Sequence, residues 1–164
     1  MSRRRAARFA AVQALYQVEL TGRSGVEIIA EFERHRLGDL FEADGSGKQP
    51  LPVDRDHFQR TVAGASASRD KLDDAIRASL AEDWSLERVG FTLRAILRAG
   101  GYELHAFTTI DVDVVISEYV ELSREFFQGR EPAFVHAVLD RMAKRLRRPP
   151  DDLSALAEPG NGLG

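Results

Sequence analysis

The sequence predicts an all-α protein of about seven helices. Apolar residues recur every three or four positions in successive segments between residues 3 and 147, as on the buried face of a helix. Residues that favour helix starts and stops stand at the ends of these segments. No segment sustains the two-residue alternation of a half-buried strand, and the best candidate, residues 110–115, lies within a longer helical pattern. The 164 residues suffice for one compact domain.

The first two predicted helices each follow a serine. Ser2 precedes residues 3–21, which contain no proline or glycine and end before Gly22. Apolar residues surround most of this segment, so we expect a central helix that is buried on several faces. Ser24 precedes a weaker apolar stripe, which predicts a second helix over residues 25–37.

A long connection and further helical sequence follow. Residues 38–53 are rich in glycine, proline and charged residues, which predicts a mobile loop. Asp54 is placed to cap a helix over residues 55–68, and Asp70 to cap a second segment that reaches Leu80. The pattern fits either one kinked helix or two.

The strongest helical periodicity begins after Ser85, the predicted start of the next helix. Its apolar stripe consists of Phe91, Leu93, Ile96, Leu97, Gly100 and Leu104. Gly100 and Gly101 each cost the helix about 1 kcal/mol relative to alanine, unless a neighbouring helix approaches closely. The pair therefore predicts a tight helix crossing.

Two amphipathic helices are predicted in the last third of the chain. The first covers residues 112–126. The second begins near Pro132, which suits the first turn of a helix, and ends before Pro149. Residues 149–164 are predicted to form a disordered tail.

Composition and spacing argue against several functional classes. There is no cysteine, and no apolar stretch approaches the roughly 20 residues that span a bilayer. We therefore expect a cytoplasmic protein without a membrane segment. The histidines stand in no metal-ligand spacing; they are His35, His57, His105 and His136. Because phosphate-binding loops and serine-nucleophile motifs are also absent, we expect no metal, no cofactor and no catalytic site.

Cations gather at the start of the first predicted helix, where they oppose the helix dipole. They are Arg3, Arg4, Arg5 and Arg8. Each is unfavourable by on the order of 0.3–1 kcal/mol when the helix is considered alone. RNA phosphates would account for these cations, because the helix start and the guanidinium groups would then face an anion. A solvated or frayed terminus is the alternative.

Two aromatic residues are candidates for the base stacking that single-stranded RNA recognition uses. Tyr16 lies on the arginine-bearing helix. Phe134 lies at the start of the last predicted helix, just beside its apolar stripe. For each residue the alternative is a place in the core.

Four motifs resemble those of the NusB family. The first, residues 3–8 (RRRAAR) and 11–16 (AVQALY), is similar to the family's R-R-R-A-R and V-Q-A-L-Y. The second, residues 94–98 (RAILR) and 101–104 (GYEL), resembles A-I-L-R and Y-E-L. The last two, residues 115–122 (VISEYVEL) and 134–140 (FVHAVLD), resemble V-I-N-E-A-V-E-L and F-V-N-G-V-L-D. They occur in family order and cover about residues 3–147, so the chain is identified as a member.

The resemblance implies a fold and a function. The fold is a single domain of two three-helix lobes, at about residues 1–69 and 70–148, which share one core. The function is that of a transcription antitermination factor, not an enzyme, that binds boxA-type single-stranded RNA of nascent ribosomal transcripts. The implied protein partners are a NusE-type ribosomal protein and, in the transcription elongation complex, other Nus factors. The alternative is a protein-binding helical adaptor without RNA binding.

The resemblance also implies site residues. The RNA-binding candidates are Arg3, Arg4, Arg5, Arg8, Tyr16, Arg130 and Phe134. The partner-binding candidates are Tyr102, Glu103, Glu118 and Glu121. Ala133 and His136 stand where the family commonly has lysine and asparagine, and Arg130 is a nearby source of charge. We expect Glu103→Ala to preserve the fold and to disturb the protein partner.

Overall fold

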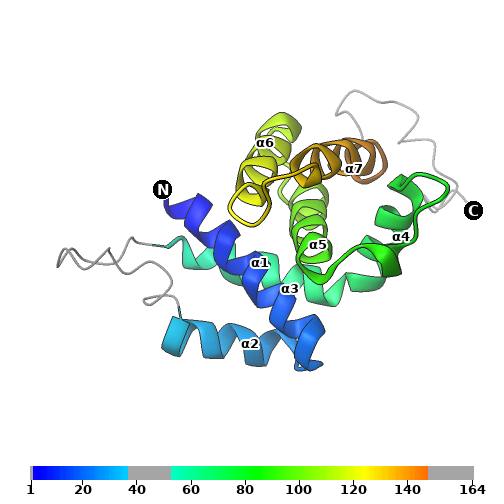
Figure 1. Cartoon of the computed structure of the whole chain (residues 1–164). Coiled ribbons are helices and arrows are strands. Elements are labelled where there is room, and N and C mark those ends of the chain that lie inside the picture. Colours follow the sequence, from blue (N-terminus) through cyan, green and yellow to red (C-terminus); the bar gives the residue numbers. More distant parts are fainter. Residues whose placement is uncertain (1, 37–52, 148–164) are drawn as a thin grey trace, which may run out of the picture.

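Seven α-helices make up most of the described chain (Figure 1). The structure is a computed structural model, and it describes residues 2–36 and 53–147. In chain order the elements are α1 (Arg3–Thr21), α2 (Gly25–Glu31), the π-helical turn η1 (Phe32–Arg36), α3 (Arg55–Ala67), α4 (Arg69–Ser79), the 3₁₀ turn η3 (Leu86–Arg88), α5 (Phe91–Ala106), α6 (Val112–Ser123) and α7 (Glu131–Leu146). These residues contain no strand, and the all-α prediction is confirmed. Apart from Val53, the predicted loop over residues 38–53 and the predicted tail over residues 149–164 lie outside the described residues.

The helices α1 and α5 are central to the packing (Figure 1). The first lobe contains α1, α2 and α3, and α1 also packs against α5. In the second lobe α5 packs against α6 and α7, and α4 lies against α5 and α7. One apolar cluster extends through both lobes and includes Val12, Phe58, Leu97, Tyr119 and Leu139. The expectation of a shared core is therefore confirmed. None of the described helices is long and apolar enough to cross a membrane.

Local capping explains where the first helices begin and end. The side chains of Ser2, Ser24 and Asp54 each accept a hydrogen bond from a main-chain amide three residues further on. Such caps typically stabilise a helix by about 1 kcal/mol. Gly22 ends α1 with a φ of 72°, a left-handed conformation that glycine adopts without steric cost. All four of these sequence-predicted boundaries are confirmed.

Other boundaries differ from the prediction. The turn η1 replaces the last turn of the second predicted helix. The helices α3 and α4 are separate and meet at Ser68, where φ is −101° and ψ is 18°, and Asp70 lies in the first turn of α4 without capping it. The helix α6 ends at Ser123, whose carbonyl accepts from the amides of Phe126 and Phe127 as the chain turns away.

The long helix after Trp84 also begins later than predicted. Ser85 precedes only the short turn η3, and α5 starts at Phe91. The Arg94 guanidinium donates to the main-chain carbonyls of Leu86 and Val89. This side chain satisfies carbonyl groups that an uninterrupted helix would have satisfied itself.

The glycine pair of α5 lies at a close crossing with α6 and α7. A methyl group on Gly100 would lie 3.0 Å from Leu139 Cδ2 and 3.3 Å from Tyr119 Cδ2. A methyl group on Gly101 would lie 2.5 Å from Met142 Cε. Only glycine allows the helices to approach this closely without repacking. The predicted tight crossing is confirmed.

Candidate RNA-binding surface

The exposed start of α1 carries three of the four predicted arginines, Arg3, Arg4 and Arg5. Arg4 Nε lies 3.7 Å from Asp54 Oδ2. Arg5 contacts α6 at two points, with its Nε and Nη2 2.9 and 3.2 Å from the two carboxylate oxygens of Glu118. Carboxylates of the protein therefore offset part of the repulsion between these cations and the helix dipole. The Arg5 side chain is still 44% exposed, so an anion can reach it.

Arg8 lies inside the protein, unlike the other three arginines. It is 3% exposed, and its Nε and Nη2 each donate to the Glu103 carboxylate at 2.9 Å. Glu103 is 0% exposed, has one oxygen 3.2 Å from His57 Nε2, and accepts a hydrogen bond from the Tyr119 hydroxyl. We call these four residues the Arg8 cluster. It joins α1, α3, α5 and α6 in the interior.

The surroundings of Glu103 keep it ionised. Burial alone would raise the pKa of this carboxyl, but the neighbouring His57 imidazole and Arg8 guanidinium outweigh burial and lower the pKa to about 2. Burial and the adjacent Glu103 carboxylate together raise the pKa of Tyr119 well above its ordinary value. Arg8 and Glu103 therefore form a buried ion pair with a hydrogen-bonded tyrosine beside it.

This burial corrects two assignments made from the sequence. Arg8 does not reach the surface where RNA would bind, and Glu103 does not reach the surface where a protein partner would bind. Both residues hold the helices together instead. The expectation that Glu103→Ala preserves the fold is corrected for the same reason, because the change would leave the Arg8 charge buried without its main partner.

A second group of ion pairs joins the other end of α1 to α4 and α5. Glu19 contacts Arg94 Nη2 at 2.6 Å and Arg98 Nη1 at 2.5 Å. Arg98 Nε also donates to Asp73 Oδ1 at 2.8 Å. Burial would raise the pKa of Glu19, but hydrogen bonds from Arg94 and Arg98 lower it overall. We call this group the Glu19 cluster; the sequence pattern did not indicate it. The cluster fixes α5 against α1 near Tyr16.

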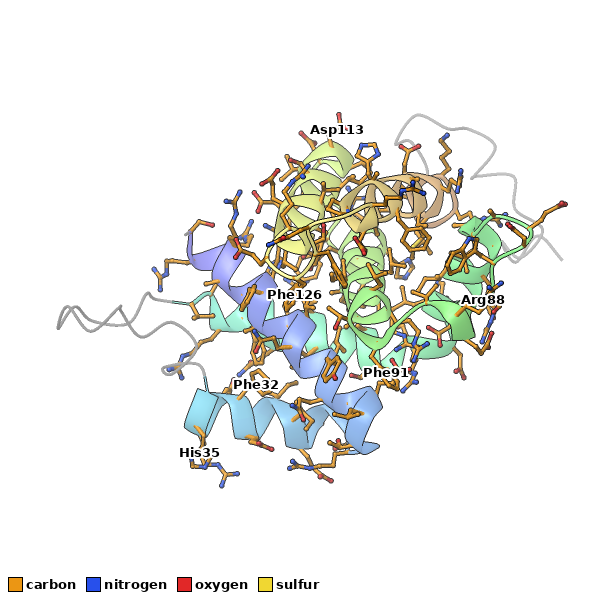
Figure 2. All side chains as sticks on the ribbon, viewed as in Figure 1. Phe32, His35, Arg88, Phe91, Asp113 and Phe126 are labelled. Atoms are coloured by element: carbon orange, nitrogen blue, oxygen red, sulfur yellow. The ribbon has the colours of Figure 1, made fainter. Side chains whose placement is uncertain are left out.

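Tyr16 lines a groove beside α1. The groove has a volume of about 250 Å³ and is lined by Val12, Gln13, Tyr16, Gln17, Thr92 and Phe126. The Tyr16 ring packs edge-on against Phe91, with ring centres 6.1 Å apart. Figure 2 shows Phe126 beside α1 and Phe91 at the start of α5, on the face turned to the viewer. Aromatic rings beside amide and hydroxyl groups provide both a stacking surface and hydrogen-bonding groups for a base. We call this the Tyr16 groove.

Phe134 lines a second groove, at the start of α7. This groove has a volume of about 350 Å³ and is lined by Trp84, Arg88, Val89, Leu93, Arg130, Glu131 and Phe134. It unites Arg130 and Phe134, which the sequence predicted, with Trp84 and Arg88, which it did not. Ala133 and His136, the two departures from the family pattern, are exposed on α7. We call this the Phe134 groove.

The remaining partner-binding candidates lie on α5 and α6. Tyr102 is partly buried, and its ring lies edge-on to Phe107 with ring centres 6.0 Å apart. Glu118 is partly buried and faces Arg5, while Glu121 is exposed. The predicted partner residue Glu118 is thus in direct contact with a predicted RNA residue. Among the described residues, no group of three or more histidine, aspartate or glutamate side chains is placed to hold a metal ion.

The fold and the surface define a class: a small all-helical protein with exposed cations at one helix start and two grooves lined by aromatic rings. The NusB family model matches residues 5–144. The chain belongs to the NusB family. The resemblance seen in its sequence motifs is therefore confirmed.

Relatives and solved structures agree with this assignment. The chain is 48% identical to "Transcription antitermination protein NusB" of Allorhizobium ampelinum over 90% of both chains. It is 48% identical to the protein of the same name from Sinorhizobium fredii over 89% of both chains. Its structure matches NusB of T. maritima with a TM-score of 0.68 at 27% identity, over 88% of this chain and 93% of that one. A NusB solved with NusE and double-stranded RNA has the same fold, with a TM-score of 0.68 at 22% identity over 86% of this chain and 96% of that one.

Proposed function

We propose that the protein is a transcription antitermination factor that binds boxA-type single-stranded RNA of nascent ribosomal transcripts. It binds this RNA jointly with a NusE-type ribosomal protein, within an elongation complex that contains other Nus factors. It acts in the cytoplasm and catalyses no reaction. Family membership, the name shared by the relatives, and the fold shared with a NusB solved with NusE and RNA support this proposal.

The observation that carries the proposal is the relation between the two aromatic grooves. Thr92 lines the Tyr16 groove, and the next residue, Leu93, lines the Phe134 groove. The first turn of α5 therefore contributes one side chain to each groove. A single strand can lay successive bases into such grooves, and each stacked base contributes about 1–3 kcal/mol.

The exposed arginines supply the second component of RNA binding. Arg3, Arg4 and Arg5 at the start of α1, together with the exposed Arg130, are the proposed phosphate contacts. Arg8 acts indirectly, because its ion pair with Glu103 fixes the helix that carries the other three. Tyr16 and Phe134 are the proposed stacking residues.

The proposed protein-binding face lies on α6 and the neighbouring part of α5. Val114, Glu118 and Glu121 are spaced by four and three residues, so they lie on one stripe of α6. Val114 is 46% exposed and adds an apolar side chain to this stripe. Tyr102 of α5 is a further proposed contact, although its ring lies against Gly64 of α3 and Phe107 and not beside the α6 stripe. Glu103 is omitted from this face because it is buried.

A binding titration with a triple variant tests the RNA proposal. Binding of end-labelled boxA-like RNA is measured by fluorescence anisotropy over a range of salt concentrations, with and without the NusE-type protein. Arg3→Ala/Arg4→Ala/Arg5→Ala should weaken binding at low salt, and the slope of log affinity against log salt should fall by about 0.7 per lost contact. Removing these cations relieves their repulsion with the helix dipole but also removes the contacts of Arg4 with Asp54 and of Arg5 with Glu118, so thermal stability should change little.

A charge-matched control separates a specific contact from a loss of net charge. Arg34, Lys71 and Arg77 are exposed on other parts of the molecule, and their triple replacement by alanine removes the same number of charges. This control should lower the salt slope far less. The alternative of a protein-binding adaptor predicts no measurable RNA binding by the parent protein at low salt, and that result would overturn the proposal.

A further inference from the structure

Trp84 is an exposed aromatic residue next to the proposed RNA surface. It is the only tryptophan in the chain, and it is 46% exposed in the segment between α4 and η3. Single exposed apolar side chains are common on proteins and by themselves indicate nothing. Trp84 differs because its ring lies 6.2 Å from that of Phe134, at an angle of 48°, and both rings line the Phe134 groove.

Cations flank these two rings. The Arg88 guanidinium lies 5.3 Å from the centre of the Trp84 ring, and Arg130 lines the same groove. Figure 2 shows Arg88 on the side of the molecule formed by the α4 to α5 connection, beyond Phe91. Stacking rings with guanidinium groups beside them are the combination that binds single-stranded nucleic acid, since the rings hold bases and the cations hold phosphates.

Glu131 indicates which part of a nucleotide would enter the groove. It also lines the groove, and its side chain is partly buried. A carboxylate repels a phosphate, but it accepts hydrogen bonds from the amino groups of bases. The interior of the groove therefore suits a base, with phosphates outside it near Arg88 and Arg130.

We infer that Trp84 and Arg88 form a further nucleotide-binding position, in which an RNA base stacks in the Phe134 groove against Trp84 and Phe134. This inference rests on the proposed RNA-binding function and extends its surface from α7 to the α4 to α5 connection. The groove volume of about 350 Å³ lies at the lower end of the range for small-ligand sites. Leu93 of this groove follows Thr92 of the Tyr16 groove in the first turn of α5, so the two grooves are neighbours on the same helix.

Because Trp84 is the only tryptophan, its fluorescence tests the inference directly. Unlabelled boxA-like RNA is added to the full-length protein, and tryptophan emission is recorded alongside the anisotropy of a labelled copy of the same RNA. Stacking of a base on the indole should quench the emission, with the same midpoint as the anisotropy curve. Phe134→Ala should reduce the quenching.

Affinity measurements on variants provide a second readout. Trp84→Ala should weaken RNA binding about 5- to 150-fold, which corresponds to the loss of one stacked base. Its salt slope should not change, because stacking releases no counterions, whereas Arg88→Ala should lower the slope by about 0.7. Trp84→Phe should retain most of the affinity. Val26→Ala, which shortens a 75% exposed apolar side chain on α2, serves as the control and should bind RNA like the parent.

The outcomes separate this inference from the function on which it rests. If anisotropy detects no RNA binding by the parent, the proposed function itself fails. RNA binding without quenching, together with unchanged affinity in Trp84→Ala, would refute the inference and leave the function intact. A change in emission caused only by the NusE-type protein would assign the groove to a protein contact and would also refute it.

Discussion

Glu103→Ala is predicted to destabilise the protein strongly, although the residue lies in a family-like motif that suggested a surface role. The change removes the carboxylate that accepts hydrogen bonds from Arg8 Nε and Nη2 and from the Tyr119 hydroxyl. Breaking a buried ion pair from one side typically costs 3–5 kcal/mol. Glu118 Oε2 lies 3.8 Å from Arg8 Nη1 and can replace part of the lost interaction, so we expect about 3 kcal/mol. That is a large share of the 5–15 kcal/mol by which domains are usually stable.

Urea unfolding followed by circular dichroism measures this loss. The urea concentration at the unfolding midpoint should fall. The slope of the free energy of unfolding against urea concentration should stay the same, because the folded state remains equally compact. Glu121→Ala removes the same side chain from an exposed position of α6, and it should change the free energy of unfolding by no more than about 0.5 kcal/mol. The double variant Arg8→Ala/Glu103→Ala removes both charges, so its loss should be smaller than the sum of the two single losses. A Glu103→Ala protein as stable as the Glu121→Ala control would refute the reasoning.

Two further predictions concern acid and packing. The pKa of Glu103 falls from 4.5 to about 2 on folding. Its ionised carboxylate therefore contributes on the order of 3 kcal/mol to the free energy of unfolding above pH 4.5, and this contribution is lost as the pH falls toward 2. The free energy of unfolding, measured as a function of pH, should show this loss. Glu103→Gln, whose side chain cannot ionise, should lose less stability between pH 4.5 and pH 2 than the parent. Equal losses in the two proteins would contradict the role of the ionised Glu103. Gly100→Val should lower stability by at least about 1–3 kcal/mol, because its side chain would overlap Leu139 and Tyr119. Ala63→Val, at an exposed position of α3, is the control in thermal unfolding, and comparable losses in the two variants would argue against a tight crossing.

The sequence predicted those parts of the fold that depend on local chemistry. Ser2, Ser24 and Asp54 cap their helices within three residues, so their role is visible without any tertiary information. The glycine pair of α5 was equally informative, because its local cost required compensation by a close neighbour. The start of α5 was predicted too early because the chain leaves the helical conformation between η3 and α5. The Arg94 guanidinium donates to the carbonyls of Leu86 and Val89 in that segment, and these contacts depend on the three-dimensional path of the chain.

The buried charges were missed because sequence proximity suggested that Arg8 belongs with Arg3, Arg4 and Arg5. A signal was available, since Arg8, Val12 and Leu15 are spaced by four and three residues and all three are buried. On α5, Ile96, Gly100 and Glu103 are likewise spaced by four and three residues, and all three are buried. An isolated charge of opposite sign on the buried stripe of each of two helices is the pattern of a buried ion pair. Trp84 and Phe126 lie outside the helices, and periodicity says nothing about where such side chains will point.

The Arg8 cluster also has a consequence for the time at which the protein can fold. Arg8 and Glu103 are separated by 95 residues, so α1 leaves the ribosome long before its ion-pair partner has been synthesised. At about 5–20 residues per second, this delay is on the order of 5–20 s. During that interval the Arg8 charge remains in water, and burying it before Glu103 arrives would cost several kcal/mol. Docking of the first helix in its native position is therefore unfavourable until α5 has been synthesised.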